Sequence, residues 1–125
     1  MATITAMEGL PKLHVTPLAS VICNAPKIIV EADDEKESRV RFTFEPYQAI
    51  RMVTADCFDV PDGMSIIPQT IMEIQNSIWI DELRNTLKMT DCEADFMDKA
   101  KHFLLPLQDD FLEIVAWDVR VESVG

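Results

Sequence analysis

The sequence predicts an α+β fold, a curved antiparallel sheet of about five or six strands with one main helix packed on one face. Three observations support this prediction. Residues 39–45 alternate apolar and polar side chains, which is the pattern of a half-buried strand. Residues 77–88 carry apolar side chains at helical spacing. Residues 102–123 contain two runs rich in β-branched and aromatic residues around a polar turn, as in a β-hairpin.

The strands of the first half of the sheet are expected at residues 27–31, 39–45 and 50–58. They are rich in Ile, Val, Phe or Met. A proline breaks the alternation after the second of them, so we expect a turn there. Phe44 then faces Ile50 across the turn, which places the apolar side chains of both strands on one side.

Residues 1–26 are expected to form a loose N-terminal arm, and residues 27–125 a single α+β domain. The arm is broken by Pro11 and Pro17 and lacks the basic start of a signal peptide. Within the arm, residues 20–23 have the composition of a short extended piece.

Residues 66–75 are open to two interpretations. A helix over residues 68–89 fits the spacing of three isoleucines. We favour a strand over residues 69–75, because Asn76 and Ser77 follow it and both are good helix N-caps.

The helix expected at residues 77–88 has an apolar stripe that is predicted to face the core. Residues 90–93 resemble a capping box that begins a short second helix reaching residue 100. The stripe consists of Trp79, Ile80, Leu83 and Leu87.

The 125 residues include 22 acidic and 11 basic side chains, a net charge of −11. This balance disfavours nonspecific attraction to nucleic acid or anionic membranes. No run approaches the ~20 apolar residues of a membrane span, so we expect no membrane partner. The odd number of cysteines, without a C-x-x-C spacing, fits a reducing compartment and a cytoplasmic location. We expect these cysteines to be small buried side chains: Cys23, Cys57 and Cys92.

The motifs of phosphate-binding loops, zinc proteases and nucleophile elbows are absent. We therefore expect no enzymatic activity, no cofactor and no metal. Asp109 and Asp110 form a carboxylate pair, but they lie at the expected hairpin turn, where carboxylates are normally solvated. His102 lies in an expected strand and is interpreted as a packing residue.

Glu113 is the candidate functional carboxylate of this sequence. If Leu107 pairs with Phe111, Glu113 lies opposite Leu105 and shares a face with Phe103. A carboxylate on an apolar face is costly to bury unless it is paired. We therefore expect a basic partner for Glu113, which could be Arg120, Lys101 or a basic residue of a neighbouring strand.

Residues 41–50, 77–83 and 102–117 together resemble a family of small uncharacterised cyanobacterial proteins. The resemblance covers residues 27–122. It implies a fold near the Whirly-type transcriptional regulators, which bind single-stranded DNA. It implies no catalytic or ligand-binding residues, because the family has no established activity.

Two classes of function follow from these observations. The first is a non-catalytic protein–protein interaction module or homodimeric regulatory module. It is expected because the closing hairpin is apolar on both faces and one face needs a partner. The alternative is a regulator that binds single-stranded nucleic acid through a local basic face of the sheet. The residues of this face would be Arg39, Arg41, Arg51 and Tyr47.

Overall fold

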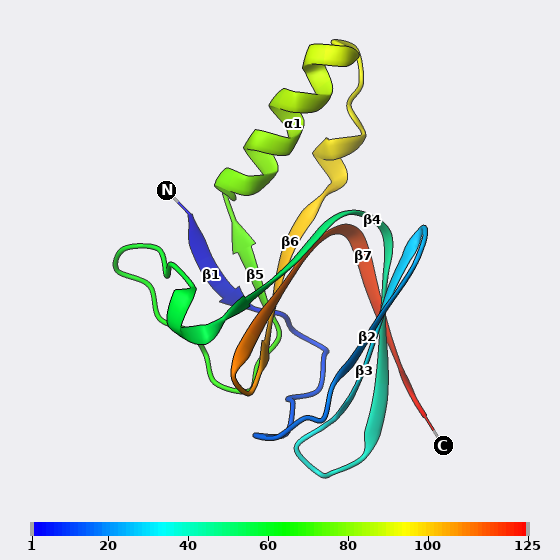
Figure 1. The fold of residues 1–125 in the computed structure, drawn as a ribbon, viewed down its shortest axis with the longest axis vertical. Coiled ribbons are helices and arrows are strands. Elements are labelled where there is room, and N and C mark those ends of the chain that lie inside the picture. The colour runs from blue at the N-terminus through cyan, green and yellow to red at the C-terminus, as the bar shows by residue number, and fades with distance from the viewer. Residues whose placement is uncertain (1, 125) are drawn as a thin grey trace.

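The computed structural model describes residues 2–124 and confirms the α+β class with a curved sheet (Figure 1). Within this range, seven antiparallel strands form one sheet in the order β1-β5-β6-β7-β4-β3-β2. The described residues also form one α-helix and two short 3₁₀ helices. The elements are β1 (Thr3–Ala6), β2 (Ser20–Asn24), β3 (Lys27–Asp33), β4 (Arg39–Thr54), η1 (Ala55–Cys57), β5 (Met72–Gln75), α1 (Ile78–Thr90), η2 (Phe96–Lys99), β6 (Lys101–Leu107) and β7 (Asp110–Ser123).

Residues 2–26, the described part of the expected N-terminal arm, contribute two strands to the sheet rather than forming a loose arm. β1 and β2 form the two edges of the sheet and pair with β5 and β3. These two strands explain why the sheet has seven strands rather than five or six. β1 has four residues and β2 is mostly exposed, so neither shows the regular alternation of a half-buried strand. The extended piece expected at residues 20–23 is confirmed by β2.

β4 is one bent strand, where the sequence predicted two strands and a turn. It continues through Pro46 and pairs with β7 on both sides of that residue. The register shifts between Tyr47 and Ala49. Such a bulge bends a strand and increases its twist, so the sheet arches over at this point (Figure 1). The expected facing of Phe44 and Ile50 is therefore wrong, because both belong to the same strand.

The main hydrophobic core lies between the two limbs of this arch. Phe42 and Phe44 of β4 are fully buried, as the alternation in the sequence predicted. The rings of Phe44 and Phe103 meet edge to face, with centroids 5.1 Å apart. The same core cluster includes Ile28, Val30, Leu105, Leu112 and Ile114.

The hairpin of β6 and β7 closes through a two-residue turn rather than the three-residue turn that we expected. Leu107 pairs with Asp110, so Gln108 and Asp109 form the turn. Gln108 adopts the left-handed conformation with a φ of 57°. The exposed turn confirms the interpretation of Asp109 as a solvated residue.

The shorter turn moves the register of the hairpin by one residue. Glu113 pairs with Leu104, not with Leu105. Because successive side chains point to opposite faces, this shift removes Phe103 from the face that carries Glu113. His102 takes that place instead.

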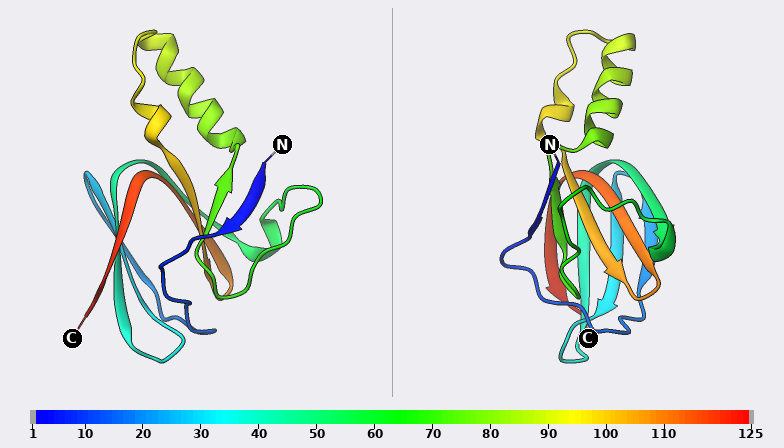
Figure 2. Two further views of the ribbon diagram at one scale, coloured as in Figure 1. Left: turned by 180° about the vertical axis from the view of Figure 1, so that it is seen from behind. Right: turned by 90° about the vertical axis from the view of Figure 1, so that its left-hand side faces the viewer.

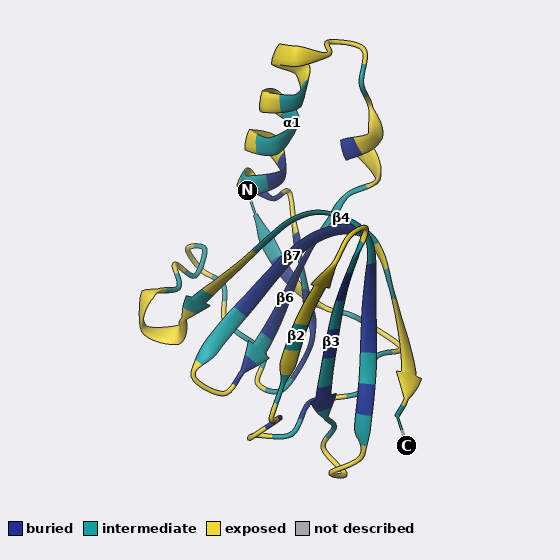
Figure 3. Cartoon of the chain, turned by 45° about the vertical axis from the view of Figure 1, so that its right-hand side comes forward, coloured by how far each residue is buried: buried dark blue, intermediate teal, exposed yellow. Residues whose placement is uncertain are grey.

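The outer face of the hairpin is covered by the chain itself (Figure 3). Residues 58–67 pack over the cluster that contains Leu104. Val115 packs against Ile80 and Met97 from the helical segment. These segments cover part of the apolar face from which we expected a homodimer. The oligomeric state stays a prediction.

α1 begins where the sequence predicted. The backbone N–H of Ile80 donates a hydrogen bond of 3.1 Å to Ser77 Oγ, which caps the helix. Ile80 is the one buried residue of α1, so the helix contacts the sheet near its first turn and projects beyond it (Figure 2). Its partly buried apolar side chains join a cluster with η2. None of the helices in residues 2–124 is long and apolar enough to cross a bilayer.

The short second helix expected from the capping box at residues 90–93 is wrong. Thr90 is the last residue of α1 and so does not begin a new helix; its hydroxyl donates to the carbonyl oxygen of Leu87. A turn and the 3₁₀ helix η2 follow instead. The strand expected over residues 69–75 is confirmed in its second half, by β5.

Candidate small-molecule pocket

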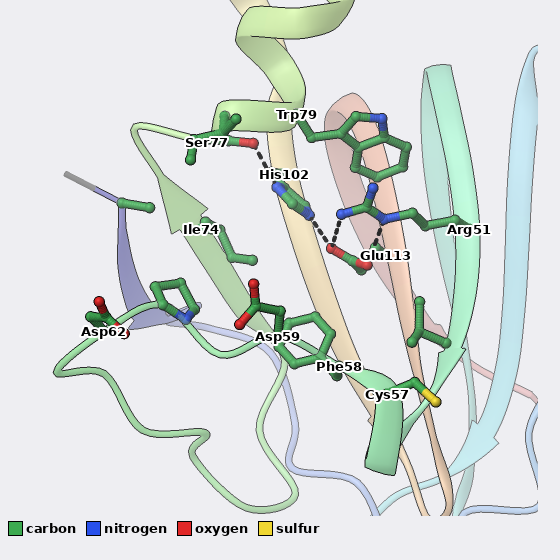
Figure 4. A pocket seen from close by; sticks show the side chains of 14 residues that line it. Arg51, Cys57, Phe58, Asp59, Asp62, Ile74, Ser77, Trp79, His102 and Glu113 are labelled. Carbon is green, nitrogen blue, oxygen red and sulfur yellow. Dashed lines mark hydrogen bonds and ion pairs between the residues drawn. The ribbon is translucent and has the colours of Figure 1, made fainter.

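A pocket of about 580 Å³ lies on the outer face of the hairpin (Figure 4). The second half of β4, the loop after it, and the junction of β5 with α1 form its walls. This volume is within the range of roughly 300–1,000 Å³ that is usual for small-molecule sites. Its apolar walls include Val53, Phe58, Ile74, Ile78 and Trp79.

Four side chains from different elements form a hydrogen-bonded network on one side of the pocket (Figure 4). His102 Nδ1 lies 2.7 Å from Ser77 Oγ, and His102 Nε2 lies 2.8 Å from Glu113 Oε1. Arg51 donates from Nε to Glu113 Oε2 at 2.7 Å and from Nη2 to Glu113 Oε1 at 3.1 Å. Ser77, His102 and Glu113 are buried, whereas the Arg51 side chain is 47% exposed. The network therefore runs from the protein interior to the surface of the pocket.

Trp79 packs against two members of this network. The Arg51 guanidinium carbon lies 4.0 Å from the centroid of the indole, within the range of a cation–π contact. The rings of Trp79 and His102 meet edge to face at 5.3 Å. The guanidinium is thus held between a carboxylate and an aromatic ring, which restricts its orientation.

The hydrogen-bond geometry assigns the proton of His102 to Nε2. Glu113, as a carboxylate, can only accept, so Nε2 donates to it. Ser77 Oγ accepts from the N–H of Ile80 and, when the imidazole is neutral, donates its own proton to Nδ1. With a neutral imidazole in this tautomer, both ring nitrogens of His102 have a partner.

Two opposing effects act on the pKa of Glu113. Burial raises the pKa, because the charged form loses hydration. The hydrogen bonds from His102 and Arg51, together with the charge of Arg51, lower the pKa and outweigh burial. The net pKa is below the usual value, so Glu113 is ionised at neutral pH. Glu113 is buried and has a basic partner on a neighbouring strand, as expected, but it does not lie on the expected face beside Phe103.

Strand register brings the members of the network together. Arg51 and Glu113 are directly paired across β4 and β7. His102 lies two residues from Leu104, the partner of Glu113 on β6, and so shares the face of Glu113. Ser77 reaches the same place because it follows β5 directly and caps α1.

The residues expected to form a nucleic-acid face lie in separate parts of β4. Arg41 and Arg51 are ten positions apart, which is up to about 33 Å along a strand. Tyr47 is partly buried against the main core. Each arginine is engaged by carboxylates, so the set offers little free positive charge to a phosphate backbone. The pairs are Arg39 with Asp33, Arg41 with Glu31 and Glu122, and Arg51 with Glu113.

Sequence reasoning missed three residues of the site. Ser77 was predicted only as a helix cap, Trp79 only as a core residue, and His102 only as a packing residue. A histidine, a glutamate and an arginine on adjacent strands were a usable signal. Recognising that these three residues share a face requires the correct register of the hairpin. The expected register was wrong by one residue and placed Phe103, not His102, beside Glu113.

The cysteines are exposed, so the expectation that they are buried is wrong. Cys57 lines the pocket, whereas Cys23 and Cys92 lie outside its walls. Across residues 2–124, no three metal-binding side chains come together. Comparisons of this chain with family models, curated proteins and solved structures found no match. The resemblance to a cyanobacterial family and to Whirly-type regulators therefore stays a prediction.

Proposed function

We propose that this chain binds a small organic molecule in the pocket and does not transform it chemically. The observation that carries the proposal is a pocket of about 580 Å³ whose apolar walls adjoin a buried hydrogen-bonded network. Apolar walls supply affinity, and a few fixed polar groups orient a ligand. Both are present here.

Arg51 is the polar group best placed to contact a ligand. Two of the five N–H donors of its guanidinium bond Glu113. The remaining donors lie on a side chain that lines the pocket and is 47% exposed. Glu113 and Trp79 already restrict the guanidinium of Arg51. A hydrogen bond from it to a ligand oxygen therefore costs little further side-chain entropy.

A binding role is favoured over catalysis because Ser77, His102 and Glu113 already hydrogen-bond one another. A general acid at neutral pH needs a raised pKa, whereas the pKa of Glu113 is lowered. Ser77 Oγ is engaged in capping α1. The proposal keeps the non-catalytic class that we expected from the sequence, with a small molecule in place of a protein partner. It includes a cytoplasmic location, which the free cysteines support.

The test uses indole-3-ethanol, a neutral aromatic probe, at millimolar concentration with the full chain. Iodoacetamide labelling is followed at each cysteine by mass spectrometry. We expect the probe to slow alkylation of Cys57, which lines the pocket, and to leave Cys23 and Cys92 unchanged as internal controls. An equal effect on all three thiols contradicts the proposal, and so does the absence of Cys57 protection by this probe and by its cationic and anionic analogues.

A pair of variants ties this protection to the pocket. Val53→Trp fills the pocket and should abolish the protection of Cys57. Met52→Trp, on the adjacent position of β4 outside the pocket walls, is the matched control and should preserve it. Folding of both variants is checked by circular dichroism. Protection that survives in a folded Val53→Trp variant places the probe elsewhere.

A second candidate function is ester hydrolysis, favoured by the bonded series of Ser77, His102 and Glu113. Ser77 Oγ would attack the ester carbonyl carbon while its proton passes to His102 Nδ1. That proton would then go to the departing alcohol, and water would release the acid from the acyl-serine. Labelling of Ser77 by a fluorophosphonate, found by mass spectrometry, would favour this function. Absence of label on the folded chain removes it.

A further inference from the structure

We propose that the ligand of this pocket is an organic cation, an apolar body that carries an amine. This inference rests on the proposed function and specifies the chemistry of the ligand. The evidence is that some of the charged side chains lining the pocket are paired with an opposite charge and others are not.

Four ionised side chains line the pocket: Arg51, Asp59, Asp62 and Glu113. Arg51 and Glu113 neutralise each other through two hydrogen bonds. Asp59 and Asp62 are exposed and make no hydrogen bond or ion pair with any residue in the range 2–124. Two carboxylates of the pocket are therefore left without a positive partner in the described part of the chain.

The two aspartates lie on the wall across from the network. Both come from the loop that follows η1, and Asp59 is next to Phe58 in the sequence (Figure 4). A ligand that lies along Phe58 and Ile74 thus meets carboxylates at one side and the guanidinium of Arg51 at the other. An ammonium group fits the first side, and a neutral oxygen fits the second.

The net charge of the chain also favours a cationic ligand over an anionic one. A net charge of −11 concentrates small cations near the surface and repels anions. A carboxylate ligand would have to approach against this field and past Asp59 and Asp62. Its one attractive partner, Arg51, is already paired with Glu113.

The test compares three probes with the same indole ring: tryptamine (cationic), indole-3-ethanol (neutral) and indole-3-acetate (anionic). Affinities are measured by calorimetry and by protection of Cys57. We expect tryptamine to bind roughly tenfold more tightly than indole-3-ethanol at low salt, and indole-3-acetate to bind most weakly. The advantage of tryptamine should shrink as salt is added.

The double variant Asp59→Asn with Asp62→Asn should reduce the affinity for tryptamine to that for the neutral probe. Asp95→Asn with Asp109→Asn is the matched control, because it removes the same charge from exposed positions outside the pocket walls. Equal binding of the three probes, or a preference for indole-3-acetate, overturns the cation proposal and leaves the pocket proposal standing. Failure of every probe to bind at millimolar concentration overturns the pocket proposal itself.

Discussion

Replacing Glu113 with glutamine tests whether the buried network stabilises the fold. Glutamine keeps the size of the side chain and one carbonyl acceptor, which can still bond His102 Nε2. Its amide group then faces Nε of Arg51, so two donors meet where a donor and an acceptor met before. Arg51 also loses the charge that compensates its own.

We expect the free energy of unfolding to fall by about 2 kcal/mol. A hydrogen bond to a charged group contributes about 1.5–3 kcal/mol. The Glu113 side chain is 2% exposed, which favours the upper part of this range, whereas the Arg51 side chain is 47% exposed and partly screened by water. For 125 residues with an unfolding entropy of about 2.1 cal/mol/K each, this loss lowers Tm by roughly 8 °C.

The matched control is Glu122→Gln, which makes the same change on the same strand. The Glu122 side chain is 54% exposed and pairs with Arg41, so its loss should change stability by less than about 0.5 kcal/mol. Urea and thermal unfolding of both variants are followed by circular dichroism. Equal losses in the two variants would refute the reasoning, because burial of the Glu113 pair would then contribute nothing.

Three further outcomes are expected. Because the pKa of Glu113 is lowered in the folded state, its stabilisation is complete above the unfolded-state pKa of about 4.3 and is lost as pH falls through the folded-state value. Urea midpoints should thus decline less between about pH 5 and 2 in Glu113→Gln than in the parent, and equal declines contradict this. Fluorescence anisotropy should detect no binding of a labelled single-stranded oligonucleotide at low salt, because carboxylates neutralise Arg39, Arg41 and Arg51; salt-dependent binding would revive the nucleic-acid function. Light scattering at micromolar concentration should give a monomer, because the chain covers both faces of its own hairpin; a dimer would show that another surface is an interface.

The elements that the sequence predicted correctly are those set by short-range patterns. The alternation around Phe42 marked a half-buried strand, and Ser77 marked the start of α1. The bend of β4 could not be predicted in this way. A proline at the end of an alternating segment indicates a turn as readily as a bulge. Only the pairing of β7 with β4 on both sides of Pro46 decides between them. The edge strand β1 was missed because an edge strand needs little apolar alternation of its own.

Glu113 was identified from the sequence because a carboxylate within an apolar run must find a partner. The particular residues that bond to the network of Glu113 were not identified, because their positions depend on how distant segments of the chain pair. Arg51 and Ser77 lie 62 and 36 positions from Glu113 in the sequence.

Local patterns of polarity thus determined the α+β class, the strand at residues 39–45, the helix cap and the need of Glu113 for a base. Tertiary structure alone decided that β4 is continuous, that the chain covers its own hairpin, and that Ser77, His102, Glu113 and Arg51 meet beside a pocket. The physical reason is register. A strand presents alternate residues to opposite faces, so one residue in the length of a turn decides whether phenylalanine or histidine lies beside the buried carboxylate.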